Sequence, residues 1–463
     1  SELAPEEDQS ILYVSSKSPQ TATLDYNITY ANQMIEAFQT IPEYKESFMV
    51  IGFDNARHQM FGGFKMPSTD ERSRDQKSVQ QDLQTKLFGI TGVQSVAFPR
   101  SSLPTPGRGL PIQFVILSPE EEETLDKVAD NIIGASLGTG KFLFLRKSIE
   151  FNRPLIKIEV DRSKAGLLGI NMVALGLDLS TLLGGNYVNR FSQQGRSYKV
   201  IPQVEQKFRE NQGMLNNYYI RSTNDSLVPL SSFASFKETV EPSERLQFQQ
   251  MNAIIVEGVV SPSSNMGEAI KVLEKNIKSA PFKNLSWDYA GEARQFKSQS
   301  SALIVTFLVS LMVIYLVLAA QFESWVDPLI ILTSVPLSLF GALFFASLGL
   351  VSLNIYTQVG LITLIGLVAK NGILIVEFAN RVIKEEGASK REAIEKASLL
   401  RLRPILMTTV ATIVAMIPLL IAVGPGAESR FQIGLIISTG LGFGTIFTLF
   451  VVPVFYIILS QKK

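Results

Sequence analysis

One lysine lies inside a long apolar stretch of this chain. Residues 360–378 read GLITLIGLVAKNGILIVEF, with Lys370 near the middle. An unpaired ammonium at the depth of a lipid bilayer costs about 2.5 to 3.5 kcal/mol even on lenient insertion scales, so a carboxylate or carbonyl partner is expected. Either the lysine is tolerated structurally, or its counter-charge lies on polypeptide outside these 463 residues. We favour the second interpretation.

Patterns that would indicate an enzyme are missing from the sequence. It has no Ser/His/Asp arrangement, no phosphate-binding GxxxxGK[ST] loop and no His/Cys metal spacing, and His58 is its one histidine. We therefore expect no enzymatic activity, no cofactor and no metal. A formal charge of +1 without a basic tract gives no reason to expect a nucleic acid as partner.

The elements that must position Lys370 fall into two regions. About the first 295 residues mix charged and apolar residues as a globular chain does, and the remainder is overwhelmingly apolar. Crossing the hydrocarbon core takes about 20 apolar residues in a helix. Five stretches qualify as membrane spans: 301–320, 327–349, 355–379, 404–424 and 431–460.

The basic residues orient these spans. We expect a loop at 380–403, and this loop and the C-terminal tail are rich in lysine and arginine. The positive-inside rule therefore predicts that both lie in the cytoplasm and that the water-exposed region lies outside, which for a bacterial cell means the periplasm. Because the sequence starts without methionine or an apolar signal segment, we expect it to be a fragment of a longer polypeptide.

The water-exposed region is predicted to contain two similar α+β modules. Residues 11–99 alternate as strand, helix, strand, strand, helix, strand, the β-α-β-β-α-β order of ferredoxin-like folds. A second set of elements begins at 111–117 with a helix at 121–133. It resumes at 253–260, followed by a helix at 267–277 and a strand at 287–290. An insertion over about 150–250 separates its halves.

Several motifs in collinear order resemble one known family. They are DRSKAGLLGIN (161–171), GGNYVNRF (184–191), VPLSSF (228–233), AAQFESW (319–325), GLVAKNGILIVEFAN (366–380) and RLRPILMTT (401–409). Together they resemble the C-terminal half of resistance-nodulation-division efflux pumps of the hydrophobe/amphiphile type. Each motif alone would be a weak signal, whereas their joint occurrence is strong.

The resemblance implies a proton/drug antiporter of the bacterial inner membrane that exports amphiphilic drugs or detergents. Its expected partners are an N-terminal half with an intramembrane Asp pair, two further copies in a homotrimer, a periplasmic adaptor and an outer-membrane channel. The implied division of the chain is a first porter subdomain (1–108), a second porter subdomain in two parts (109–149 and 251–296), a docking insertion (150–250) and a transmembrane domain (297–463).

The resemblance also implies roles for individual residues. In the membrane, Lys370 resembles the lysine that pairs with the two aspartates of the proton relay, Thr408 a nearby threonine and Arg401 an arginine on its cytoplasmic side. An ammonium near two carboxylates can change partners when one of them takes up a proton. The positions implied to bind substrate are Phe48, Val50, Phe53, Phe64, Tyr13 and Arg146.

Other interpretations stay open at this stage. Without the resemblance, the aromatic positions read as sheet core, Thr408 as a side chain bonded to its own helix and Arg401 as a positive-inside anchor. The loop after Phe53 departs from the family, where glycines and another aromatic are common, so the substrates can differ. The alternatives for the whole chain are a heavy-metal exporter, disfavoured by scattered methionines and no cysteine, and a non-transporting scaffold component.

Overall fold

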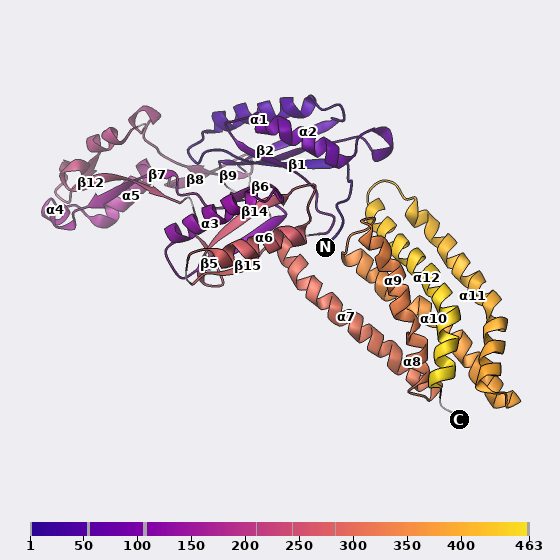
Figure 1. Cartoon of the computed structure of the whole chain (residues 1–463). Coiled ribbons are helices and arrows are strands. Elements are labelled where there is room, and N and C mark those ends of the chain that lie inside the picture. The colour runs from indigo at the N-terminus through magenta and orange to yellow at the C-terminus, as the bar shows by residue number, and fades with distance from the viewer. Residues whose placement is uncertain are drawn as a thin grey trace. The chain divides into compact units, whose positions relative to one another are not determined.

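The structure is a computed structural model that describes residues 2–52, 56–104, 109–209, 211–242, 244–282 and 284–460. Of residues 212 and 300–304 it describes only the backbone. The chain divides into two compact units, Glu150–Ser243 and the remainder. The remainder holds two α/β modules and the five apolar helices (Figure 1).

The first module follows the predicted β-α-β-β-α-β order. Its elements are β1 (Ile11–Lys17), α1 (Leu24–Gln39), β2 (Glu46–Ile51), β3 (Gln59–Lys65), α2 (Gln76–Phe88) and β4 (Gln94–Pro99). The strands pair in the order β2-β3-β1-β4, and every pairing is antiparallel. Thr23 and Asp75 cap the two helices through their side-chain oxygens. Both helices cover the sheet face that carries Leu12 and Val14, which gives this module its own core (Figure 1).

The second module is assembled from two separated segments. Its elements are β5 (Ile112–Ser118), α3 (Glu122–Leu137), β6 (Phe142–Lys147), β13 (Leu246–Phe248), β14 (Met251–Val260), α6 (Met266–Ser279) and β15 (Ser286–Tyr289). Strand β14 pairs with both β5 and β6, so the chain returns to the same sheet after the insertion. Strand β6 was not predicted from the sequence, and it supplies Arg146.

The unit Glu150–Ser243 has a small core of its own. Its elements are β7 (Arg153–Val160), α4 (Arg162–Leu167), α5 (Met172–Leu182), β8 (Asn189–Gln193), β9 (Arg196–Val200), β10 (Tyr219–Arg221), β11 (Leu227–Pro229) and β12 (Ala234–Glu241). The motif at 161–171 has a structural role here, because Asp161 caps α4 and Asn171 caps α5. Leu230 and Phe233 of the VPLSSF motif are buried in the core.

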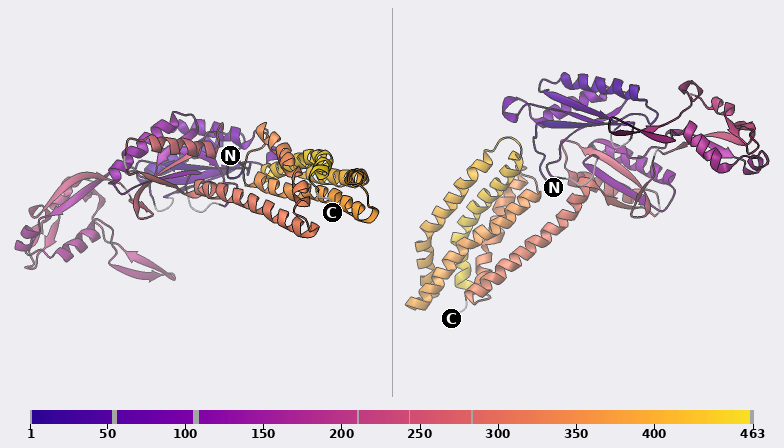
Figure 2. Two further views of the ribbon diagram at one scale, coloured as in Figure 1. Left: turned by 60° about the horizontal axis from the view of Figure 1, so that its bottom comes forward. Right: turned by 180° about the vertical axis from the view of Figure 1, so that it is seen from behind.

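Among the residues that the structure describes, five helical segments are long and apolar enough to cross a membrane, as predicted: Val305–Phe322, Asp327–Ser347, Ile355–Glu386, Lys390–Leu420 and Ala427–Leu459. They belong to α7 (Gly291–Phe322), α8 (Asp327–Leu332), α9 (Ser334–Ser347), α10 (Ile355–Glu386), α11 (Lys390–Leu420) and α12 (Ala427–Leu459). Figures 1 and 2 show α7 as one long helix that meets the other apolar helices near its C-terminal end.

One boundary prediction is wrong. Residues 380–403 were expected to form a loop, but α10 continues to Glu386 and α11 begins at Lys390. The helix restarts at a capping box, in which Ser389 and Glu392 each bond to the backbone N–H of the other. The basic residues therefore lie mostly on helical turns that extend past the apolar stretch.

Residues 440–444 of α12 read GLGFG, and this glycine-rich run allows close helix packing. A Cβ atom added at Gly444 would lie 2.6 Å from the Cβ of Ser338 in α9, and one added at Gly440 would overlap the side chain of Leu364 in α10. Helices α9, α10 and α12 thus contact one another along this run. A larger residue at Gly444 would push α9 and α12 apart, because the Ser338 Cβ cannot move without its backbone, whereas at Gly440 the end of the Leu364 side chain can shift.

Candidate functional site

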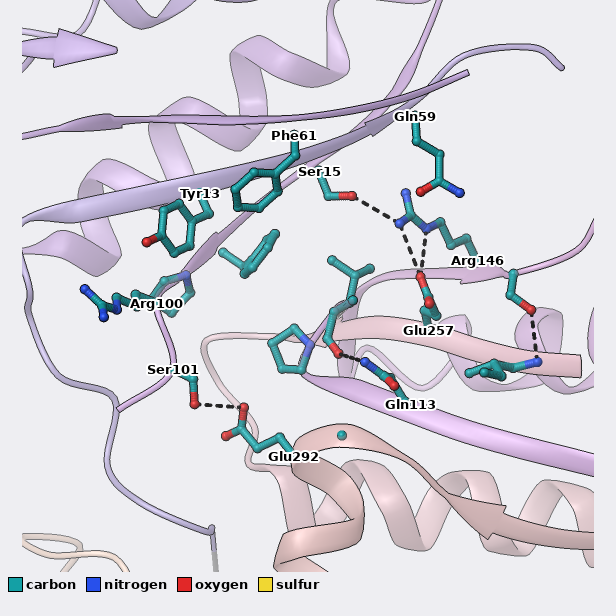
Figure 3. Close-up of a pocket in the computed structure, with 18 of the residues that line it drawn as sticks. Tyr13, Ser15, Gln59, Phe61, Arg100, Ser101, Gln113, Arg146, Glu257 and Glu292 are labelled. Atoms are coloured by element: carbon teal, nitrogen blue, oxygen red, sulfur yellow. Dashed lines mark hydrogen bonds and ion pairs between the residues drawn. The ribbon is translucent and has the colours of Figure 1, made fainter. Parts of the chain in front are cut away.

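A cavity of about 640 Å³ lies between the two α/β modules. Strands of both modules contribute polar or aromatic side chains to its wall, among them Tyr13 and Ser15 (β1), Phe61 (β3), Arg146 (β6) and Glu257 (β14). Figure 3 shows these side chains directed toward one another across the space, with Gln113, Ser101 and Glu292 along the lower edge. Its size and its mixture of aromatic and polar groups suit a small organic ligand.

The polar wall of the cavity is built around Arg146. Its guanidinium pairs with the Glu257 carboxylate at 3.2 Å and donates a hydrogen bond of 3.1 Å to the Ser15 hydroxyl (Figure 3). The register of β6 against β14 places Arg146 directly opposite Glu257. The Nη1 group of Arg146 is buried and has no hydrogen-bond partner among the described residues. Because the atom is buried, the Arg146 side chain would have to shift before this donor could reach a ligand oxygen, and buried N–H groups favour such a partner.

Aromatic rings make the opposite wall. Tyr13 contacts Phe61 and Phe98, with ring centroids 5.2 and 6.2 Å apart. The ring centroids of Phe48 and Phe61 lie 6.0 Å apart on the same face of the sheet. Val50 of β2 lies directly opposite Phe61 of β3. Phe48 and Val50 extend this aromatic face beyond the cavity lining, and they are 42% and 45% exposed.

The structure corrects the placement of Phe64. This residue was grouped with Phe48, but it is fully buried in the core beneath α1 and α2 and contacts Phe38 at 5.6 Å. Successive side chains of a strand point to opposite faces, so Phe61 faces the cavity whereas Phe64 cannot. The alternation of β3 could have indicated Phe61. The predicted position Phe53 lies outside the described residues.

Glu292 lies at the cavity edge, at the start of α7. Burial raises the pKa of its carboxyl to about 7, and repulsion from Glu6 and Glu2 adds to the effect. The Ser101 hydroxyl donates a hydrogen bond of 3.4 Å to the carboxylate, and this bond by itself would lower the pKa of Glu292. The edge of the cavity therefore contains a carboxyl that changes charge near neutral pH.

In the membrane region, Lys370 lies midway along α10 with its side chain exposed. By the 1.5 Å rise per residue it stands about 22 Å from the first residue of the helix. No ion pair or hydrogen bond of its ammonium is found within the described part of the chain. Glu377, on the same helical face, is two turns away and pairs with Arg381 at 3.4 Å. Lys370 thus faces outward from this bundle.

The other two predicted relay residues lie on α11. Thr408 is exposed and its hydroxyl donates to the Ile405 carbonyl at 3.1 Å, the local bond expected of a threonine inside a helix. The Arg401 guanidinium lies 5.0 Å from the ring centroid of Phe378 on α10, a cation–π arrangement. The structure therefore does not bring Lys370, Thr408 and Arg401 into direct contact.

The residues next to them form a buried polar contact that was not predicted from the sequence. Thr445 of α12 accepts a hydrogen bond of 3.2 Å from Asn371, and its hydroxyl lies 3.1 Å from that of Thr409. Asn371 directly follows Lys370 in the sequence, and Thr409 directly follows Thr408. Small polar residues inside apolar helices are a known signal of interhelical hydrogen bonds, and this signal could have found them.

Comparison with known proteins adds to these observations. The family described as AcrB/AcrD/AcrF matches residues 1–460. An uncharacterized transporter of Haemophilus influenzae is 36% identical over 98% of this chain, and this match spans 45% of the relative. The multidrug resistance protein MdtF of Escherichia coli K12 is 29% identical over 99% of the chain and 45% of its own length.

A third relative, the toluene efflux pump membrane transporter TtgB of Pseudomonas putida, is 31% identical over 99% of the chain and 44% of its own length. The chain thus spans about half the length of these relatives. The family match and the five apolar helices place it in the bacterial inner membrane, as the motifs predicted. The chain belongs to the AcrB/AcrD/AcrF family of resistance-nodulation-division efflux pumps.

Proposed function

We propose that this chain is the C-terminal half of a proton/drug antiporter that exports hydrophobic and amphiphilic compounds. The observation that carries the proposal is the position of Lys370. An ammonium midway along a membrane helix, exposed and without a partner in the described chain, requires a counter-charge from another part of the protein. We infer that an intramembrane Asp pair on the N-terminal half supplies it.

A proton would act on this arrangement through charge. When one aspartate takes up a proton, its attraction for Lys370 falls, and the ammonium moves toward the remaining carboxylate. The buried contact among Asn371, Thr409 and Thr445 joins α10 to α11 and α12, so a displacement at Lys370 would move these helices together. Thr408 and Arg401 are proposed to border the same path on α11.

The cavity is proposed to hold the exported compound. Its aromatic wall offers apolar area without many fixed hydrogen bonds, which suits ligands of varied shape. The proposed substrate-binding residues are Tyr13 and Arg146 in the cavity, Phe48 and Val50 on the adjoining sheet face, and Phe61 in place of Phe64. Arg146 would orient the polar end of an amphiphile.

The proposed architecture follows the family. The modules at 1–108 and at 109–149 with 251–296 are proposed to be ferredoxin-like porter subdomains in the periplasm, and 150–250 to be the docking insertion. The transmembrane domain covers 297–463. We propose a homotrimer that works with a periplasmic adaptor and an outer-membrane channel.

The test uses Lys370→Ala in the full-length protein that carries this chain, with Lys384→Ala as the control. Lys384 is an exposed lysine near the C-terminal end of the same helix. We expect Lys370→Ala to abolish dye export driven by a proton gradient while assembly, measured by size-exclusion chromatography, is kept. Lys384→Ala should export normally. Export at the wild-type rate by Lys370→Ala would refute the proposal.

A further inference from the structure

Two adjacent carboxylates in the segment before β1 bind two different helix ends. The first is Glu7, whose side chain is only 5% exposed. It accepts hydrogen bonds from the backbone N–H groups of Glu428 at 3.3 Å and Ser429 at 2.8 Å, and from the Ser429 hydroxyl. These groups form the first turn of α12, whose own N-cap residue, Gly426, supplies no side-chain cap. Glu7 thus acts as the N-terminal cap of a membrane helix.

The second carboxylate, Asp8, points to the first module. It accepts a hydrogen bond of 3.2 Å from the backbone N–H of Gln76, the first residue of α2. It also pairs with Arg72, whose side chain is 1% exposed. The backbone N–H of the next residue, Gln9, donates a hydrogen bond of 3.1 Å to the side-chain oxygen of Gln76. Residues 8 and 9 are therefore fixed to the N-terminal end of α2.

The same segment connects α10 to the cavity wall. At its start, the Glu2 N–H donates to the Leu353 carbonyl and the Ile355 N–H donates to the Leu3 carbonyl, so it is bonded to the first residue of α10. At its end it continues into β1, which places Tyr13 in the cavity. Asn354, the N-cap of α10, also bonds to Gln432 of α12.

We propose that Glu7 and Asp8 form a two-carboxylate clamp that transmits displacement of α12 to strand β1 and thereby couples proton uptake by the proposed aspartate pair near Lys370 to the shape of the drug cavity. The inference rests on the proposed antiport function. If α12 shifts, Glu7 must follow it or lose three hydrogen bonds while staying buried, and an unsatisfied buried carboxylate is costly. Since Asp8 is the next residue, movement of Glu7 pulls on α2 and β1. Glu7 and Asp8 are positioning residues in this scheme.

The experiment compares Glu7→Ala with two other variants of the full-length protein. Glu7→Gln keeps an oxygen that can accept the same N–H groups. Glu6→Ala is the matched control, because Glu6 is the exposed neighbour and pairs only loosely with Lys77, at 3.5 Å. In proteoliposomes we measure how much a transported dye accelerates proton flux, and in detergent we measure binding of the same dye.

A second measurement does not depend on transport. The chain has no cysteine, so spin labels at Gln81→Cys in α2 and Arg430→Cys in α12 report the distance between the two clamped helices, with any cysteine elsewhere in the protein replaced by serine. We expect Glu7→Ala to broaden this distance distribution and to lower dye-stimulated proton flux by about fivefold, the factor that results if the whole stabilisation by one helix cap is lost from the coupling equilibrium. Dye binding should be unchanged, and Glu7→Gln should restore most of the coupling.

The outcomes separate the two proposals. If Glu7→Ala keeps a narrow distance distribution and normal stimulation, the clamp is refuted. If the wild-type protein shows no proton-coupled transport, the antiport function fails, and the distance measurement alone still decides whether Glu7 joins the helices. Equal loss of coupling in Glu6→Ala would also refute the clamp. Should Glu7→Ala not assemble, Glu7→Asp, one methylene shorter, takes its place and must show the same loss.

Discussion

Replacing Glu292 with glutamine should remove a pH-dependent loss of stability at the cavity edge. The folded protein holds the pKa of this carboxyl at about 7, above the ordinary value of 4.5, mainly because the carboxyl is buried. At pH values between 4.5 and about 7, the Glu292 carboxyl is more often protonated in the folded protein than in the unfolded chain. The stabilisation is therefore complete below pH 4.5 and is lost as the pH rises through about 7.

The size of the effect follows from the same two pKa values. Each pKa unit corresponds to about 1.36 kcal/mol, so the difference between 4.5 and about 7 amounts to about 3 kcal/mol at most. Glu292 as a whole keeps some exposure to water, which screens its charge, so this value is an upper limit. Glutamine resembles the protonated carboxyl and can still accept the hydrogen bond from Ser101.

The assay is denaturant unfolding of the purified protein in detergent between pH 4.5 and 8. Glu292→Gln and wild type should unfold at similar denaturant concentrations near pH 4.5, and the variant should become more stable by up to about 3 kcal/mol at pH 8. Glu36→Gln, at an exposed position of α1, serves as the control. A stability difference between wild type and Glu292→Gln that does not change with pH would refute the reasoning.

Three further predictions concern the packing around the site. Phe61→Ala should weaken binding of a fluorescent amphiphile with little change in the free energy of unfolding, whereas Phe64→Ala should lower that free energy by about 3 to 5 kcal/mol; the reverse order would contradict the face assignment. Arg146→Ala should lower the free energy of unfolding by about 1 to 3 kcal/mol, because it leaves Glu257 without its cation. The double variant Arg146→Ala with Glu257→Ala should regain part of this loss in denaturant unfolding, and no regain would contradict the pairing. Thr445→Val should lower the free energy of unfolding by about 1 kcal/mol through loss of its interhelical hydrogen bonds, and an unchanged unfolding midpoint would argue against them.

Local signals in the sequence predicted most elements. The alternation in residues 11–17 predicted a strand, and the apolar runs after residue 300 predicted helices. Both predictions lie close to the observed elements. Strand β6 was missed because Phe142–Lys147 is short and ends in two basic residues. The loop at 380–403 was predicted because this segment lies between two apolar spans and is rich in charge, although the capping box at Ser389 and Glu392 was a sequence signal for a helix start.

The sequence by itself determined which segments can cross a membrane and that one of them carries a lysine, because hydropathy and charge are properties of each segment alone. Only the tertiary structure decided which side chains share a face or a contact. A shift of one residue moves a strand's side chains to the other face of the sheet, which separates Phe61 from Phe64. Glu7 accepts a hydrogen bond from Ser429, 422 residues further along the chain. This contact depends on the packing of the whole unit, and no local sequence pattern predicts it.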